Sequence, residues 1–250
     1  MRIICLGDSI MQFNDWTSFP QSGWVQFLDR FFVPGTQILN FARNGRSSKS
    51  FIQEGRLKLA LSKTVPEDFV LIQFAHNDEK IQDESRFSSP EKGGEFRKNL
   101  AFFIDSFKEK NALPLLLTPV TRRKFSSPYK IENSHGIYPD AIKDVALEKN
   151  IPCLDLTAAT TDFFEKKGDE GSKRYFMNFG PGIFENFPEG KNDNSHLRPE
   201  GAFAVCSLFV QLLKKLDFEH FSAYKPLNDA LALNGIYSDK EIDDEKIMWH

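Results

Sequence analysis

The chain has 250 residues, of which 40% are hydrophobic and 27% charged, with a formal net charge of −3. A chain of this length can bury a substantial core, and we expect one domain over residues 1–250, with a core over 2–215 and a C-terminal extension over 216–250. The weakly acidic charge gives no reason to expect nucleic acid as a partner. No apolar run approaches the roughly 20 residues that span a bilayer, so we expect no membrane partner either.

The start of the chain lacks the pattern of an export signal, because Arg2 leads directly into a short apolar run without a small-residue cleavage site. The three cysteines, Cys5, Cys153 and Cys206, lie far apart in apolar stretches, which predicts buried reduced thiols. No CxxC motif or His/Cys cluster indicates a metal. These observations favour a cytoplasmic protein, although a trimmed secreted chain begins in the same way.

Five short apolar runs predict β-strands. They are rich in Ile, Val and Leu, and none alternates polar with apolar residues, which is typical of strands buried on both faces. In chain order they cover 2–6, 36–41, 68–74, 114–119 and 152–156.

Segments with helical spacing lie between these runs. Residues 24–32 carry one apolar stripe, and residues 51–61 belong to a second segment, which is opened by a capping box from Ser50 to Gln53. Further helices are predicted over 92–110, 138–149 and about 200–215. Because strand and helix alternate five times, the pattern predicts an α/β fold with a parallel sheet and helices on both faces.

Two regions have no clear element of this kind. The stretch 160–195 contains five glycines and predicts a long loop region before the last helix. The tail from about 217 admits an added helix, a frayed end or a contact surface. Nothing in the sequence indicates an oligomeric state.

Polar residues follow the predicted strands, at the carboxyl edge where ligands collect in an open parallel sheet. In chain order these groups are Gly7-Asp8-Ser9, Ala42 to Ser47, Ala75 to Asp78, Thr121-Arg122-Arg123 and, before the last helix, Asp193 to His196. We therefore expect their side chains to converge.

Ser9 admits two interpretations. A G-D-S tripeptide after a strand is often an ordinary turn with a helix cap, but the hydroxyl becomes a nucleophile when a base and an orienting acceptor stand beside it. His196 is one of only five histidines, and Asp193 lies three residues before it, close enough to accept from its imidazole. The three residues together predict a Ser-His-Asp arrangement.

An attacking hydroxyl also needs donors for the oxyanion that forms. The Ser9 N–H, the Gly45 N–H and the Asn77 side chain come from three successive strand ends and could supply them. Taken singly, Gly45 is equally a turn glycine and Asn77 an Asx-turn residue. Their occurrence in order at three strand ends favours an oxyanion hole.

These motifs resemble the four sequence blocks of the SGNH (GDSL-type) hydrolases, and longer strings are similar to the rhamnogalacturonan acetylesterases and their bacterial relatives acting on pectin. The likeness covers roughly residues 2–215. The strings that carry it are GDS, GWVQFLDRFF, NFARNGRSSKSFIQEGRL, VLIQFAHNDE, LLLTPVTRRKF, HGIYPDAIKDVA and DNSHLRPEGA.

The resemblance implies a three-layer α/β/α sandwich with a five-stranded parallel sheet, the flavodoxin-like SGNH hydrolase fold. It also implies Ser9 as nucleophile, His196 as base, Asp193 as its partner, and Ser9, Gly45 and Asn77 as the oxyanion hole, with no cofactor and no metal. Two positions depart from the family pattern, since Ala75 stands where a glycine is usual, and Ile10 follows the serine where relatives carry a small or polar residue.

The implied function is that of a serine esterase, releasing acetate from acetylated pectic (rhamnogalacturonan) oligosaccharides. Guanidinium groups pair well with carboxylates such as that of galacturonate. The candidate substrate contacts are Arg46, His76, Arg122 and Arg123, with Arg43 and Arg86 on segments at the same edge. His135 is interpreted as a structural or site-wall residue.

Three alternatives remain open. The same triad could act on acetylated xylan, another O-acetyl sugar or a short-chain lipid ester. A flavodoxin-like phosphate-binding domain is disfavoured, because neither G-x-G-x-x-G nor G-K-[ST] follows the first strand. A catalytically inactive carbohydrate-binding relative is disfavoured by the intact triad residues.

Overall fold

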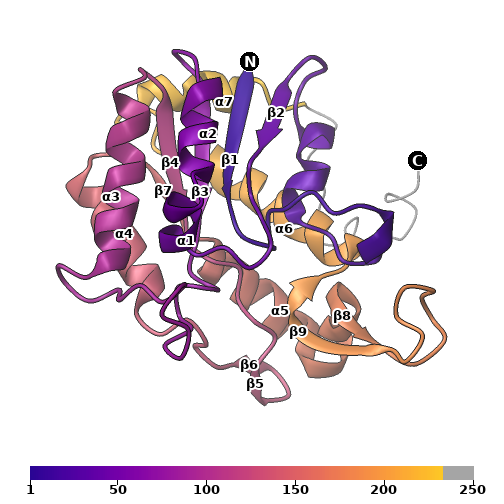
Figure 1. The fold of residues 1–250 in the computed structure, drawn as a ribbon. Coiled ribbons are helices and arrows are strands. Elements are labelled where there is room, and N and C mark those ends of the chain that lie inside the picture. The colour runs from indigo at the N-terminus through magenta and orange to yellow at the C-terminus, as the bar shows by residue number, and fades with distance from the viewer. Residues whose placement is uncertain (233–250) are drawn as a thin grey trace.

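Five parallel strands form the central sheet of the protein, whose structure is a computed structural model that describes residues 1–232 (Figure 1). In spatial order the strands are β2 (Gln37–Asn40), β1 (Arg2–Gly7), β3 (Phe69–Gln73), β4 (Leu113–Leu117) and β7 (Cys153–Leu154). All four pairings are parallel. The predicted five-stranded parallel sheet is thus confirmed.

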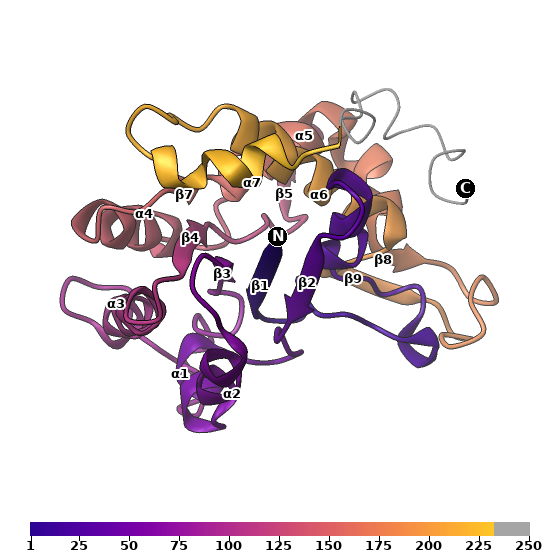
Figure 2. The same ribbon diagram turned by 90° about the horizontal axis from the view of Figure 1, so that it is seen from above.

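Helices cover both faces of this sheet, as Figure 2 shows from above. One layer consists of α1 (Ser48–Gln53), α2 (Arg56–Lys63), α3 (Glu95–Lys108) and α4 (Tyr138–Glu148). The other contains the 3₁₀ helix η2 (Trp24–Phe31), α5 (Leu156–Ser172) and α6 (Pro199–Lys214). The result is the expected three-layer α/β/α arrangement.

Alternate strand residues supply the two cores. Ile4 and Leu6 of β1 pack in the cluster with α1 to α4, whereas Ile3 and Cys5 pack in the cluster with η2, α5 and α6. Successive side chains in a strand point to opposite faces, so a strand covered on both sides needs apolar residues at every position. This requirement explains why the strand runs show no alternation of polarity.

The second helical segment differs from its predicted form. Its N-cap is Ser47, whose hydroxyl accepts from the Ser50 N–H, so the predicted capping box from Ser50 to Gln53 is wrong by one turn. The segment is also two helices, because Gly55 between α1 and α2 has φ of 74°, a left-handed conformation that glycine adopts without strain.

The predicted long loop over 160–195 is wrong for most of its length. Residues up to Ser172 belong to α5, followed by the 3₁₀ helix η3 (Lys173–Tyr175) and by the antiparallel pair β8 (Phe176–Phe179) and β9 (Lys191–Leu197). Gly168, with φ of 72°, interrupts α5 without ending it, and only the connection between β8 and β9 is loop.

The start of the C-terminal extension packs against the core. The 3₁₀ helix η4 (Ser222–Tyr224) and α7 (Lys225–Asp229) follow α6, and the Tyr224 hydroxyl donates to the Pro114 carbonyl at 2.6 Å. Residues 233–250, the rest of the expected extension, lie outside the described residues.

The remaining short elements are one 3₁₀ helix and one small antiparallel pair. The 3₁₀ helix η1 (Trp16–Ser18) follows β1, and β5 (Phe125–Ser127) pairs with β6 (Lys130–Ile131). All three cysteines are free thiols, and Cys5 and Cys206 are buried as predicted, whereas Cys153 is partly exposed. Over residues 1–232, no helix has the length and hydropathy needed to cross a membrane.

Candidate active site

The predicted polar groups meet at the carboxyl edge of the sheet, around a cavity of about 410 Å³. Segments after β1, β2, β3 and β4 contribute to its wall, together with β9. The lining residues are Ser9, Ile10, Asn44, Gly45, Arg46, His76, Asn77, Lys80, Arg86, Arg122, Ser195 and His196.

Ser9 stands at the first turn after β1. The Asp8 carbonyl accepts from the N–H groups of Met11 and Gln12, and the Asp8 carboxylate accepts from the Ile10 N–H at 2.9 Å. Gly7 is required here, because a Cβ would lie 2.7 Å from the Gln73 carbonyl oxygen and 2.6 Å from Met11 Sδ. Ile10, one of the two departures noted in the sequence, is buried in the core and leaves Ser9 in place.

A large bulge in β9 brings His196 to Ser9. Phe176 of β8 pairs with Leu197, but the next residue, Met177, pairs with Asp193, so residues 194–196 have no partner opposite them. The extra residues curl out of the ladder, as bulges do. His196 Nε2 lies 3.0 Å from Ser9 Oγ, and His196 Nδ1 lies 2.8 Å from Asp193 Oδ2.

The Asp193 carboxylate organises this bulge. Its Oδ1 accepts from the backbone N–H groups of Ser195 and His196, at 2.9 and 3.0 Å. Burial raises its pKa, but the hydrogen bonds and the imidazole of His196 outweigh burial and lower the pKa to about 2. The anion therefore holds the Nδ1–H of His196, which leaves Nε2 free to accept the Ser9 hydroxyl proton.

Three donors face the cavity beside Ser9. Within residues 1–232 the N–H groups of Ser9 and Gly45 form no hydrogen bond, so both are available to a ligand. Gly45 has φ of 77°, which favours glycine at this turn. Asn77 Nδ2 donates one hydrogen to the Arg46 carbonyl at 3.1 Å and keeps its second hydrogen.

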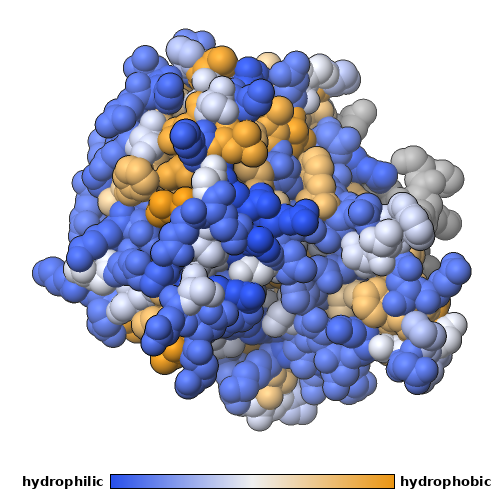
Figure 3. Space-filling model, viewed as in Figure 1, coloured by the Kyte–Doolittle hydropathy of each residue, from blue (hydrophilic) through white to orange (hydrophobic). Residues whose placement is uncertain are grey.

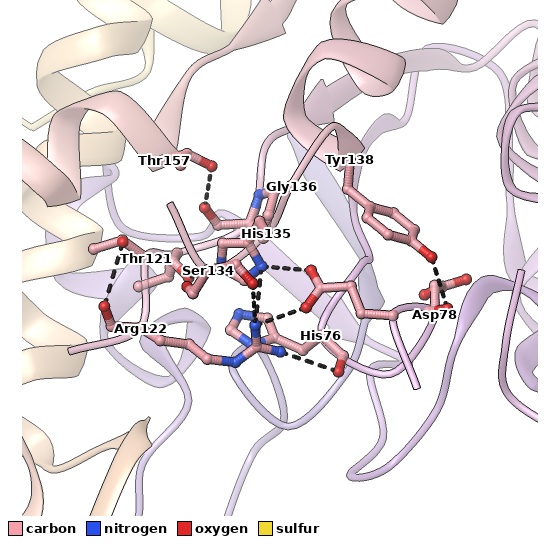
Figure 4. A network of polar contacts seen from close by, with 12 residues as sticks. His76, Asp78, Thr121, Arg122, Ser134, His135, Gly136, Tyr138 and Thr157 are labelled. Carbon is pink, nitrogen blue, oxygen red and sulfur yellow. Dashed lines mark hydrogen bonds and ion pairs between the residues drawn. The ribbon is translucent and has the colours of Figure 1, made fainter. Parts of the chain in front are cut away.

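The segment that carries Asn77 is tied to the neighbouring helix. Asp78 Oδ1 accepts from the N–H and the hydroxyl of Ser48, at 2.9 and 2.5 Å. The Tyr138 hydroxyl donates to the Asp78 carbonyl, as Figure 4 shows. Burial raises the pKa of Asp78 to about 8. Ala75, the other departure, has φ of 155°, where a side chain is strained, but the Asn77 amide still reaches the cavity.

Arg122, one of the candidate substrate contacts, lines the cavity, and its positive charge is balanced by Glu79. Its guanidinium lies 2.6 Å from Glu79 Oε2 and also donates to the carbonyls of Ser134 and His76 (Figure 4). Glu79 also contacts His135 Nδ1 at 2.5 Å, so His135 has the structural role that was one of its two interpretations. Sequence reasoning missed Glu79, the acidic residue beside the H-N-D block.

His76 and Arg46 also line the cavity. His76 is buried edge-on against His135, with ring centroids 4.7 Å apart, and burial holds its pKa well below the usual range. Arg46 forms an ion pair with Glu54 at 2.8 Å. Its backbone carbonyl holds Asn77, as described above.

Arg123 points away from the cavity, although it adjoins Arg122. It is buried among Asp169, Ser172 and Asn194, and its Nη1 donates to Asn194 Oδ1 at 2.8 Å. The backbone N–H of Arg123 also donates to the Asn194 carbonyl at 2.8 Å. Arg123 therefore holds the bulge that carries His196. It does not line the cavity, where a substrate contact was predicted.

Two further cations stand at the cavity. Arg86 is among the arginines that the sequence places at this edge, whereas sequence reasoning missed Lys80. Arg86 pairs with Asp83 at 3.0 Å, and its guanidinium lies 3.7 Å from the position of a Cβ on Gly45. Among the described residues, Lys80 Nζ has no ion pair or hydrogen bond. Partial burial and the charges of Arg86 and Arg122 lower the pKa of Lys80. Over the same residues, no group of three or more His, Cys, Asp or Glu is placed to hold a metal ion.

Comparison with known proteins finds a matching family model, similar esterases and a similar crystal structure. The sequence model of the GDSL-like Lipase/Acylhydrolase family matches residues 5–202. The rhamnogalacturonan acetylesterase RhgT of Bacillus subtilis is 36% identical over 216 residues, covering 86% of this chain and 90% of RhgT. The probable rhamnogalacturonan acetylesterase YesY of the same organism is 34% identical, covering 86% of this chain and 93% of YesY. The crystal structure of YxiM from Bacillus subtilis superposes with a TM-score of 0.73 at 26% identity, covering 85% of this chain and 56% of that one.

Proposed function

The chain belongs to the GDSL-like Lipase/Acylhydrolase family and is an esterase, and from this premise we propose that it releases acetate from acetylated pectic oligosaccharides of the rhamnogalacturonan type. The observation that carries the proposal is the hydrogen-bonded series from Asp193 through His196 to Ser9, open to a cavity with three donors beside it. The similarity to RhgT and YesY supports the substrate class.

The proposed reaction runs in two halves. Ser9 Oγ attacks the acetyl carbonyl carbon as His196 Nε2 takes the hydroxyl proton, and the oxyanion accepts hydrogen bonds from the Ser9 N–H, the Gly45 N–H and the Asn77 amide. The bond to the sugar oxygen then breaks, and that oxygen leaves with the proton from His196. Water, deprotonated by the same imidazole, attacks acetyl-Ser9 and releases acetate, restoring the serine.

The cations of the cavity support a substrate that carries a carboxylate. Arg46 and Arg122 have their charges balanced by Glu54 and Glu79, and Arg86 by Asp83, whereas Lys80 Nζ has no such partner within the described residues. An ammonium group in the wall of the cavity that holds Ser9 favours a uronate over a neutral sugar, because a charge-assisted contact is available only to the uronate.

The substrate assignment is tested by comparing kcat/KM for acetate release from acetylated rhamnogalacturonan oligosaccharides, acetylated xylo-oligosaccharides and long-chain nitrophenyl esters. We expect the highest value for the pectic substrate. The Lys80→Met variant should then raise KM for that substrate by roughly three- to tenfold and leave the xylan substrate unchanged. Lys58→Met, on the exposed surface of α2 and outside the cavity, is the matched control. A higher kcat/KM for the neutral sugar or the lipid-like ester would instead support the alternative ester substrates.

A further inference from the structure

The cavity at Ser9 continues along the surface as a groove. A second cavity of about 370 Å³ shares Asn44 and Arg46 with the first, and a third of about 560 Å³ shares Asn14, Asp15 and Gln21 with the second. We call the second and third cavities together the aromatic groove. It leads from the site at Ser9 to Trp16 and Phe184.

Aromatic side chains are unusually exposed in and beside this groove. Trp16 is 80% exposed, and Phe13 and Phe19 are 49% and 39% exposed. Phe19 packs edge-on against Phe184, with ring centroids 5.7 Å apart. A flat apolar surface left in water beside a reactive site is typical of a ligand groove, since its burial by a ligand is favourable.

The segments that carry these rings are held in place. Asn186, in the loop between β8 and β9, donates to the carbonyls of Trp16 and Phe19 at 2.7 and 2.9 Å. Figures 1 and 2 both show this loop beside the segment after β1, and Figure 3 shows a small pale-orange patch among hydrophilic residues there. Because the carrying backbone is fixed before a ligand arrives, less ordering is required on binding.

The remainder of the groove is lined by side chains that bind hydroxyl groups. In the second cavity they are amides, hydroxyls and one carboxylate, together with the guanidinium groups of Arg43 and Arg46: Gln12, Asn14, Asp15, Thr17, Ser18, Gln21 and Asn44. The third cavity adds Ser22, Gln26, Asn186 and a second carboxylate, that of Glu185. Flat apolar faces and many hydroxyl partners match a pyranose ring, which has an apolar C–H face and a rim of hydroxyls. A protein partner would favour a more apolar centre to the contact.

We propose that the aromatic groove binds the sugar units that flank the acetylated unit of an oligosaccharide, with one ring stacked on the Trp16 indole. The inference rests on the proposed function, because it places the acetylated unit in the cavity at Ser9. It adds that the enzyme recognises a chain of several sugars and not only the acetylated residue.

The kinetic test compares Trp16→Ala with the wild type on acetylated pectic oligosaccharides of increasing length and on nitrophenyl acetate. We expect wild-type kcat/KM to rise with chain length, and Trp16→Ala to lose about tenfold on the long chains, mainly through KM, with no change on nitrophenyl acetate. Phe102→Ala, which removes a 52% exposed ring from α3, should match the wild type on every substrate. Equal KM values for the wild type and Trp16→Ala on the long chains would overturn the inference.

A second measurement separates this inference from the proposed function. Calorimetric titration with a deacetylated pectic oligosaccharide requires no chemistry, and we expect binding by the wild type that is weakened at least about tenfold in Trp16→Ala. Binding of this kind supports the groove even if no acetate is released, whereas no binding by the wild type at millimolar ligand overturns it. A Trp16→Ala variant that turns a dimer into a monomer while retaining oligosaccharide affinity also overturns it, because the rings then form a contact between copies of the chain.

Discussion

Asp193 and His196 lie three residues apart on β9, yet their side chains meet, with Asp193 Oδ2 2.8 Å from His196 Nδ1. In a regular strand residues i and i+3 point to opposite faces. The contact exists because residues 194–196 bulge out of the pairing with β8 and because Asp193 Oδ1 accepts two N–H groups of the bulge. The orientation of His196 toward Ser9 is therefore a property of the bulge as well as of the two side chains.

Replacing Asp193 tests whether its charge orients the imidazole. Asp193→Asn removes the anion that a pKa of about 2 keeps ionised throughout the working pH range. We expect kcat on nitrophenyl acetate to fall by roughly 10⁴-fold, because the amide admits the wrong imidazole tautomer. The melting temperature, measured alongside, should change little. A kcat within threefold of wild type would contradict the assigned role.

Asn77 is expected to stabilise the oxyanion. Asn77→Ala should lower kcat by roughly 10²–10³-fold with little change in KM, since the lost donor acts on charge that develops only in the transition state. Asn192→Ala, which removes an exposed amide outside the cavity, is a suitable control. If Asn77→Ala raised KM and left kcat unchanged, the side chain would instead be a contact for the bound substrate.

Asn194 is predicted to position the bulge without touching substrate. Its Oδ1 accepts from Arg123 Nη1 at 2.8 Å and from Asn178 Nδ2 at 2.7 Å. Asn194→Ala should lower kcat about tenfold and leave KM unchanged, because small displacements of a catalytic group slow the reaction. Asn192→Ala, on an exposed residue of the same strand, should retain wild-type kcat. Similar values for both variants would exclude this positioning role.

The buried carboxyl of Asp78 predicts a pH dependence of stability. Burial raises its folded-state pKa to about 8, whereas a carboxyl in the unfolded chain titrates near 4. Between these values the folded protein keeps the proton that the unfolded chain gives up, so the free energy of unfolding falls by about 1.4 kcal/mol per pH unit on this account.

Asp78→Asn keeps an acceptor for Ser48 but cannot ionise. Its free energy of unfolding, relative to wild type, should therefore increase from pH 5 to pH 8, as measured by urea denaturation. Asp83→Asn, whose exposed carboxyl has a lowered pKa, should give a difference that stays constant over the same range. A constant difference for Asp78→Asn as well would show that its carboxyl is not protonated in the folded state.

The sequence predicts one part of the site well. Ser9, Gly45 and Asn77 follow three strands of a parallel sheet, and such ends must share an edge, so strand recognition alone places the three donors together. The cavity at that edge is lined by all three residues.

The other part depends on pairing that local patterns do not reveal. The bulge at residues 194–196 exists only relative to β8, a four-residue strand inside a glycine-rich stretch that resembles a loop. The sequence likewise does not tell which of Arg122 and Arg123 faces the cavity, because both lie on an irregular segment without periodicity. Distant partners decide their directions, with Glu79 drawing Arg122 to the cavity and Asp169 and Asn194 drawing Arg123 away.

The central claim is that Ser9 is the nucleophile of an acetylesterase. The most direct measurement is acetate release from acetylated rhamnogalacturonan oligosaccharides by the wild type and by Ser9→Ala at equal concentration. The account predicts steady turnover by the wild type and a rate lower by roughly 10⁴–10⁶-fold in the variant, with the fold unchanged by circular dichroism. Equal activity of the two proteins, or no activity in either, would contradict it.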